Sequence, residues 1–126
     1  MGMTQCFYAV SPEDIISDTD FRDNHGMYFE FASFSKEYGI FRWMKALWEK
    51  KIGDTDEHDL TEEYLLLNEK DIQALEQDFR DGKISFKEEN QSKEVEDWMK
   101  ECFKRFLDDA KERLSWGLVI YYEVRC

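Results

Sequence analysis

The stretch Leu118-Val119-Ile120-Tyr121-Tyr122-Glu123-Val124 is the strongest strand pattern in the chain, because β-branched and aromatic residues fill it. A long helical pattern comes directly before it. Ser92 is placed to cap that helix, and its apolar residues keep a helical spacing: Val95, Trp98, Met99, Cys102, Phe103, Phe106, Leu107, Ala110 and Leu114. A second strand is expected over Gln5 to Val10, near the other end of the chain.

Two further helices are expected between these ends. The first covers about residues 34–52, begins after Ser33 and is closed by Gly53. Its apolar stripe is Phe34, Tyr38, Phe41, Trp48 and Ile52, and Met44 widens this face. The second helix begins after Asn68, which has Asp71 three residues on, and stops at Gly82.

The remaining segments are short. Residues 12–17 are expected to form a short helix or turn, residues 27–32 a strand or the entry to the next helix, and residues 64–67 an edge strand or buried connection. Ile84 and Phe86 alternate as in a short strand. The sequence therefore predicts one α+β domain over residues 1–126. Its small, mainly antiparallel sheet includes the N- and C-terminal strands and is packed by two long helices and one shorter helix.

Composition narrows the classes of function. The chain has 126 residues, 42% hydrophobic and 16% aromatic, so it can bury a sizeable core. Its 17 Lys and Arg face 29 Asp and Glu, a formal net charge of −12. Such a surface repels nucleic acid and anionic membranes, so we expect neither as a direct partner and expect a basic protein instead. Solubility alone is the other explanation for this charge.

The cysteines and the hydropathy indicate a cytoplasmic location. The three cysteines, Cys6, Cys102 and Cys126, form no C-x-x-C pair and are expected to be free thiols. No apolar run approaches the roughly 20 residues of a membrane span.

No motif for catalysis or metal binding is complete. Residues 54–59 begin like a calcium loop, but Asp59 stands where that loop needs Gly and Leu65 where it needs Glu. The histidines, His25 and His58, lie in no nucleophile–base or H-E-x-x-H pattern. We therefore expect no metal and no cofactor. No motif in the sequence supports an enzymatic function, although it is not excluded.

Clustered acids are the main candidates for binding. If the fold gathers them on one face, they imitate the charge of nucleic acid and bind a basic groove. Trp43 falls opposite the apolar stripe of its helix, either facing solvent as a contact residue or packing under a loop. The candidate binding residues are Asp54, Asp56, Glu57, Asp59, Glu62, Glu63, Glu88, Glu89 and Glu94, with Trp43 as a secondary choice.

Several short stretches carry a resemblance to a known group. They are the aromatic opening Tyr28-Phe29-Glu30-Phe31 before Phe41-Arg42-Trp43-Met44, the helix start Leu67-Asn68-Glu69-Lys70-Asp71-Ile72, and the terminal helix followed by Tyr121-Tyr122. Over about the last three quarters of its length the chain resembles small acidic phage and prophage proteins of unknown function. The resemblance implies an origin in a mobile element, whose small acidic proteins often block host machinery.

The hypothesis from sequence is a non-enzymatic acidic binding protein, derived from a phage or prophage. It would inhibit a host nucleic-acid-binding protein or defence system. One alternative is an immunity or antitoxin-type protein that neutralises a basic toxin. Another is a small enzyme using polar groups around His25 or His58. The sequence is compatible with a monomer or with a homodimer closed by an edge strand.

Overall fold

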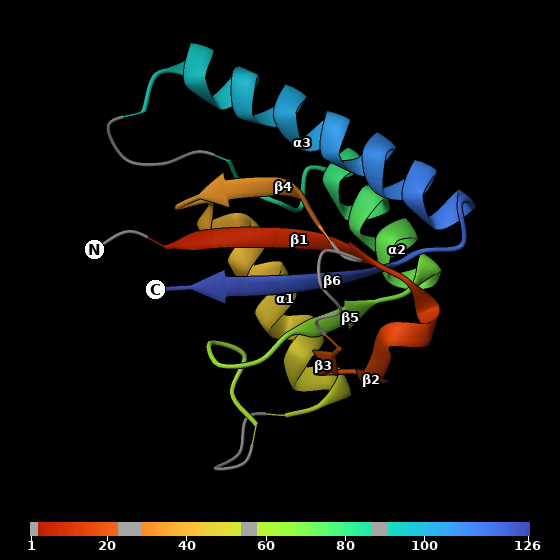
Figure 1. Ribbon diagram of the computed structural model, residues 1–126. Coiled ribbons are helices and arrows are strands. Elements are labelled where there is room, and N and C mark those ends of the chain that lie inside the picture. The colour runs from red at the N-terminus through yellow and green to blue at the C-terminus, as the bar shows by residue number, and fades with distance from the viewer. Residues whose placement is uncertain (1–2, 23–28, 54–57, 87–90) are drawn as a thin grey trace.

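A computed structural model describes residues 3–22, 29–53, 58–86 and 91–126 (Figure 1). Its four-stranded sheet has the order β4-β1-β6-β5, and a two-stranded sheet pairs β2 with β3. The strands are β1 (Thr4–Val10), β2 (Ile15–Ser17), β3 (Asp20–Phe21), β4 (Phe29–Ser35), β5 (Leu65–Leu67) and β6 (Val119–Arg125). The helices are α1 (Tyr38–Lys51), α2 (Glu69–Arg80) and α3 (Lys93–Ser115), with a 3-10 turn η1 (Pro12–Asp14).

The two ends of the chain form the centre of the sheet. Strands β1 and β6 pair antiparallel over their full length, from Thr4 opposite Arg125 to Val10 opposite Val119. Strand β4 joins the outer side of β1 and β5 joins the outer side of β6, both antiparallel. The predicted α+β fold, with an antiparallel sheet that includes both terminal strands and is packed by helices, is confirmed.

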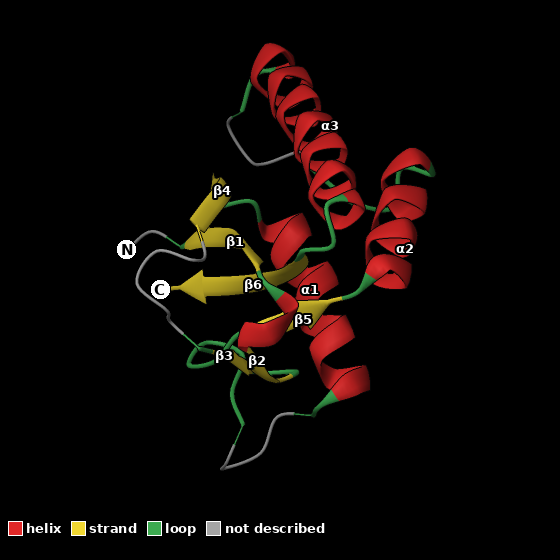
Figure 2. Cartoon of the chain, turned by 45° about the vertical axis from the view of Figure 1, so that its right-hand side comes forward, coloured by secondary structure: helices red, strands yellow, loops and turns green. Residues whose placement is uncertain are grey.

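The main core lies between the sheet and the three helices, which cover one face of it (Figure 2). Phe7 of β1 is fully buried there, with its ring 4.2 Å from that of Phe106 on α3 and 5.2 Å from that of Tyr122 on β6. Aromatic rings bury a large apolar area for few rotatable bonds, so they account for much of this core. The opposite face carries a second cluster built around Tyr8, Phe21 and Tyr121.

The first long helix begins later than predicted. Ser33 and Phe34 belong to β4, where they lie opposite Cys6 and Gln5 of β1. The chain then turns at Lys36, whose φ is 57° and whose N–H bonds the carbonyl of Met3 at 2.8 Å. Pairing with β1 supplies hydrogen bonds for the backbone groups of residues 29–35. These residues therefore form a strand, although their apolar side chains continue the helical spacing.

The buried face of α1 matches the predicted stripe only in part. Its fully buried side chains are Ile40, Met44 and Trp48, and the last two were predicted, whereas Tyr38 is 45% exposed. Gly39 lies so close to the chain at Ser85 that a Cβ there would meet the Ser85 carbonyl oxygen at 2.1 Å. Only glycine at position 39 allows α1 to approach residue 85 this closely.

The other boundaries follow local sequence signals. Asn68 and Asp71 form a reciprocal capping box at the start of α2, and Ser92 accepts a hydrogen bond from the Val95 N–H at the start of α3. Gly53 and Gly82 follow helices with φ of 83° and 72°, values that favour glycine. Residues 64–67 contain the edge strand β5, and residues 12–17 form η1 and β2. Residues 84–86 form no strand, although Ile84 and Phe86 are buried.

Two expectations from composition concern membranes and thiols. In the part of the chain that the structure describes, no helix is both long and apolar enough to cross a bilayer. Cys6, Cys102 and Cys126 are free thiols, buried, half-buried and exposed respectively.

Candidate functional site

Two acidic segments that are about forty residues apart in the sequence meet at the edge of β5 that faces away from β6. The Tyr64 N–H bonds the Thr19 carbonyl at 3.0 Å, and the Leu66 N–H bonds the Asp18 carbonyl at 2.8 Å. The turn between β2 and β3 therefore lies directly beside residues 62–66 and caps the backbone groups of this sheet edge.

The junction is hollowed and polar. A cavity of about 360 Å³ lies there, lined by Ser17, Thr19, Asp20, Glu62, Glu63 and Tyr64. Residues 13–20 and 59–63 together contain seven carboxylates and no Lys or Arg: Glu13, Asp14, Asp18, Asp20, Asp59, Glu62 and Glu63. We call Asp18, Asp20, Asp59, Glu62 and Glu63 the acidic site. All but Glu63 are exposed, and Glu63 is half-buried.

A phenol from the sheet holds the β2–β3 hairpin in place. The Tyr121 hydroxyl donates to the carbonyls of Ser17, at 2.7 Å, and Asp20, at 3.0 Å. Burial raises the pKa of Tyr121, and the charges of Asp18 and Asp20 raise it further. The phenol is therefore a neutral donor at physiological pH, and it fixes the backbone that carries Asp18 and Asp20.

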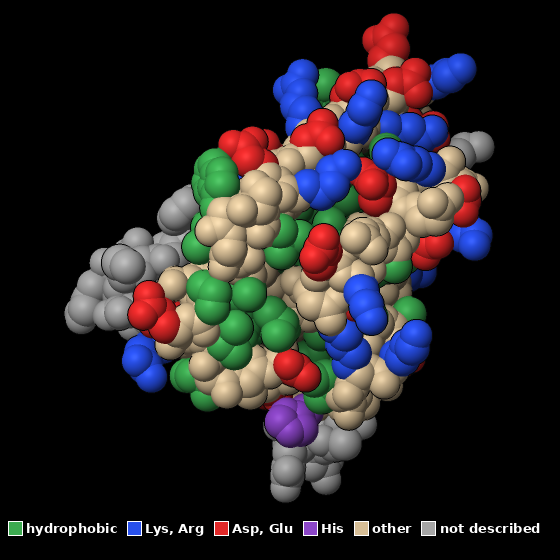
Figure 3. All heavy atoms as spheres, turned by 90° about the vertical axis from the view of Figure 1, so that its right-hand side faces the viewer, with side chains coloured by type: hydrophobic (Ala, Val, Ile, Leu, Met, Phe, Trp, Pro, Cys, Tyr) green, Lys and Arg blue, Asp and Glu red, His purple; other side chains and the backbone are tan. Residues whose placement is uncertain are grey.

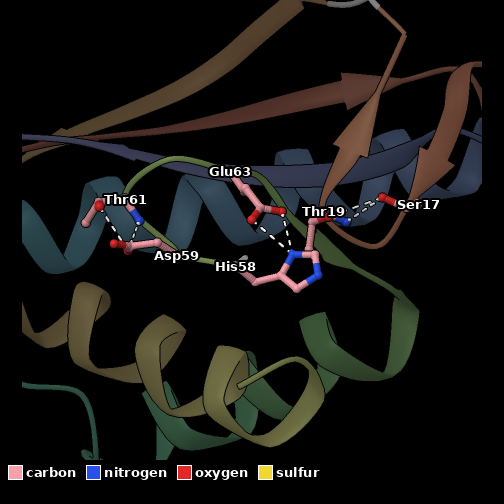
Figure 4. A network of polar contacts seen from close by, with 6 residues as sticks. All are labelled: Ser17, Thr19, His58, Asp59, Thr61 and Glu63. Atoms are coloured by element: carbon pink, nitrogen blue, oxygen red, sulfur yellow. Dashed lines mark hydrogen bonds and ion pairs between the residues drawn. The ribbon is translucent and has the colours of Figure 1, made fainter. Parts of the chain in front are cut away.

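Glu63 is held by His58, which lies beside it (Figure 4). The Nδ1 atom of His58 lies 3.0 Å and 3.1 Å from its two carboxylate oxygens. Partial burial opposes ionisation of Glu63. Hydrogen bonds from His58 and Thr19, the charge of His58 and the Asp59 backbone outweigh this effect, so the pKa of Glu63 is lowered.

Asp59 is held by the turn that follows it. Its Oδ1 accepts hydrogen bonds from the N–H and the hydroxyl of Thr61, both at 2.9 Å (Figure 4). These two bonds lower the pKa of Asp59. Asp59 and Glu63 are therefore fixed as anions near neutral pH, while the exposed Glu62 lies between them in the sequence.

The structure brings together only some of the residues predicted from sequence. Asp59, Glu62 and Glu63 share the acidic site. Glu94 is exposed at the start of α3, at the other end of the molecule in Figures 1 and 2. Glu94 therefore does not line the hollow that Glu62 and Glu63 line. Outside the described residues lie Asp54, Asp56, Glu57, Glu88, Glu89 and the histidine His25.

Trp43 does not face solvent freely. It is half-buried, packs against the core cluster on the helix side of the sheet, and donates its indole N–H to Asp78 Oδ2 on α2 at 2.8 Å. Of the two alternatives for Trp43, the solvent-facing contact residue is therefore wrong and the packed side chain is right, although its partner is α2 and not a loop. Trp43 links α1 to α2 through this bond.

Asp18 and Asp20 were recognisable as acids in the sequence but not as members of this site. Their neighbours Ser17, Thr19 and Tyr64 carry no motif at all. Their proximity depends on backbone bonds between residues 18–19 and 64–66, which close a long loop and leave no local pattern.

The chemistry of the site is that of an anionic surface. Among the described residues, no three His, Cys, Asp or Glu side chains are grouped so that they could hold a metal ion. Comparison with family models, with curated proteins and with solved structures finds no match for this chain. The site can therefore be interpreted only from its own groups, which favour Lys and Arg side chains.

Proposed function

We propose that this chain is a non-enzymatic acidic binding protein that engages a basic protein surface through the acidic site. The observation that carries the proposal is the meeting of two acidic segments around one hollow beside β5. Acids that merely kept the protein soluble would not need to converge. Here the five carboxylates of the acidic site, four of them exposed, come from two segments, residues 13–20 and 59–63, that contain no Lys or Arg.

The partner we propose is a nucleic-acid-binding protein or defence system of a host cell. Proteins that bind polyanions carry clustered Lys and Arg, and a rigid cluster of carboxylates presents charges that such a groove attracts. The resemblance to small acidic phage and prophage proteins supports an inhibitor over other binding roles.

An immunity or antitoxin-type role is the second proposal. A basic toxin would use the same acidic site, so the geometry gives no preference between the two. The identity of a captured partner separates them.

A catalytic role for His58 has less support. Its Nδ1 is engaged by both oxygens of Glu63, and this contact orders the segment that carries the acids. His58→Ala tests the alternative, because a structural histidine affects stability while a general base abolishes turnover of any substrate later identified.

The test is capture of proteins from a bacterial lysate on the immobilised chain, followed by elution in a salt gradient. A variant with Asp18→Asn, Asp20→Asn and Glu62→Gln removes three charges from the acidic site. A matched control removes three exposed charges elsewhere, through Glu49→Gln, Glu69→Gln and Glu112→Gln.

We expect a basic protein that elutes at moderate salt from the native chain and from the control, and that the acidic-site variant does not retain. Exposed charge pairs are screened over about 10 Å at 0.1 M salt, so a contact of this kind weakens steeply as salt rises. Equal retention by all three proteins, or binding indifferent to salt, would contradict the proposal.

A further inference from the structure

Helix α3 carries exposed apolar side chains in its first three turns. The buried residues of this helix are Phe103, Phe106, Leu107 and Ala110, so none of them lies before residue 103. The first half extends past the sheet (Figures 1 and 2). There Val95 is 46% exposed and Trp98 is 62% exposed, the largest value among the exposed large hydrophobic residues that the structure describes.

These side chains form one strip. Val95, Trp98 and Cys102 follow each other at spacings of three and four residues, so they are neighbours on the helix surface. Cys102 and Met99 beside it are half-buried and pack against the core, so the strip continues into the interior. A tryptophan exposed at the end of such a strip is typical of a contact surface.

The charges of α3 are sorted around the helix. At about 100° per residue, Lys93, Lys100, Lys104 and Lys111 fall on one side. That side faces α2, where Lys111 bonds Glu76 at 2.6 Å. Lys100 lies 3.4 Å from Glu96. Figure 3 views the molecule from the side of α2 and the end of α3, and it shows Lys and Arg side chains interspersed with carboxylates over the helices.

Acids lie between these lysines and the apolar strip. Glu94, Glu101 and Asp108 recur every seven residues and are exposed. Within the described residues, neither Glu94 nor Glu101 takes part in an ion pair. On the same helical wheel Arg105 falls between these acids and Trp98, about one turn further along the helix than Glu101. The apolar strip therefore has an acidic border.

We propose that the first half of α3 is a docking surface for a basic amphipathic helix of a partner protein. The apolar residues of that helix would cover Val95, Trp98 and Cys102, and its Lys or Arg side chains would lie beside Glu94 and Glu101. Helices commonly dock in this way through apolar residues spaced three and four apart. The proposal rests on the proposed function only in taking the partner to be basic, and it concerns a surface remote from the acidic site.

A second copy of this chain fits the strip poorly. Two antiparallel copies of α3 bring the border of Glu94, Glu101 and Asp108 against the same border of the other copy. Like charges that face each other across paired helices destabilise the pair, and each chain carries a net charge of −12. Charge complementarity therefore selects a basic occupant.

The test uses a synthetic 18-residue helical peptide, with Leu at the spacing of one helix face and Lys at the flanking positions, labelled for fluorescence anisotropy. A second peptide has the same composition with the leucines dispersed around the helix. We expect the dispersed peptide to bind at least about tenfold more weakly. Trp98→Ala should also weaken binding of the amphipathic peptide about tenfold or more, because buried tryptophans dominate such contacts.

Neutralising the border with Glu94→Gln, Glu101→Gln and Asp108→Asn should weaken binding and flatten its dependence on salt. Trp116→Ala is the matched control, since Trp116 is 58% exposed at the far end of the same helix. It should leave the affinity within about twofold.

Three outcomes would overturn the inference. Unchanged affinity in Trp98→Ala would show that the strip is not the docking surface. Loss of binding in the variant Asp18→Asn, Asp20→Asn and Glu62→Gln, with Trp98→Ala unaffected, would place the peptide at the acidic site, leaving the proposed function intact. A dimer that dissociates on Trp98→Ala, seen by sedimentation, would assign the strip to a second copy.

Discussion

Replacing Tyr121 with phenylalanine removes the hydroxyl that ties the β2–β3 hairpin to the sheet. That hydroxyl donates to the carbonyls of Ser17 at 2.7 Å and Asp20 at 3.0 Å. The hydroxyl has a single proton, which the two carbonyls share, so it counts as one hydrogen bond and stabilises the attached hairpin by about 0.5–1.5 kcal/mol net. Because about 1.4 kcal/mol corresponds to a factor of ten, the hairpin should open about 2- to 12-fold more often.

The amide protons of Tyr64 and Leu66 report this opening. Their acceptors are the carbonyls of Thr19 and Asp18 in the hairpin, so their exchange with solvent requires the hairpin to detach. Hydrogen exchange followed by NMR should show faster exchange at these two amides in Tyr121→Phe. The exchange rates of amides in β1 and β6 should rise only by the factor that corresponds to the change in the global free energy of unfolding.

Tyr122→Phe is the matched control. Tyr122 is the next residue, lies on the other face of the sheet, and donates to Gln5 Oε1 in the core at 2.6 Å. Its loss should lower the free energy of unfolding without detaching the hairpin selectively. Identical exchange profiles for the two variants, or an unchanged rate at Tyr64 and Leu66 in Tyr121→Phe, would refute the role given to Tyr121.

Three other predictions concern packing, pH and thiol reactivity. Gly39→Ala should destabilise the protein by at least about 2 kcal/mol, although alanine favours helices, because its Cβ would meet the Ser85 carbonyl oxygen at 2.1 Å; urea unfolding measures this. The pKa of Glu63 is lowered in the folded protein, so its ionisation stabilises the fold at pH values above its ordinary pKa of 4.5. This stabilisation is lost as the pH falls through the lower pKa of the folded state. Glu63→Gln should therefore make the free energy of unfolding less dependent on pH on the acid side. Burial raises the pKa of Cys6 to about 11, so a thiol reagent at pH 8 should modify exposed Cys126 and leave Cys6 unreacted.

Each of these has a clear contrary result. A Gly39→Ala variant as stable as the native chain would mean that α1 does not approach residue 85 closely. An unchanged acid limb in Glu63→Gln would mean that the bonds to Glu63 do not favour its charged form. Rapid labelling of Cys6 in the folded protein would mean that this face of the sheet opens readily.

Local signals in the sequence were sufficient wherever a boundary depends on residues close in the chain. The capping residues Asn68 and Ser92 and the glycines after the helices mark their helix ends correctly, because a cap satisfies backbone groups within one turn. The strand at Leu118 to Val124 and the one near the N-terminus were also found, since both are continuous apolar runs.

The same signals failed where distant segments compete. The helical spacing of apolar residues extends back to Phe34, but Phe34 pairs with Gln5 of β1 and therefore belongs to β4. For Trp43 the helical wheel left two alternatives, facing solvent or packing inside the protein, and the bond to Asp78 on α2 decides between them. In both cases a partner more than twenty residues away supplies the stabilising contact, which a local pattern cannot contain.

The sequence by itself determined the fold class, the strong acidity, the missing catalytic motifs and most helix ends, because composition and short-range spacing express them. Only the tertiary structure decided which acids act together. It joins Asp18 and Asp20 to Asp59, Glu62 and Glu63 through backbone bonds at the edge of β5. It also separates Glu94 from them and leaves Trp98 exposed. Charge density on a surface depends on distances in space, and these are fixed by strand pairing and helix packing between residues far apart in the chain.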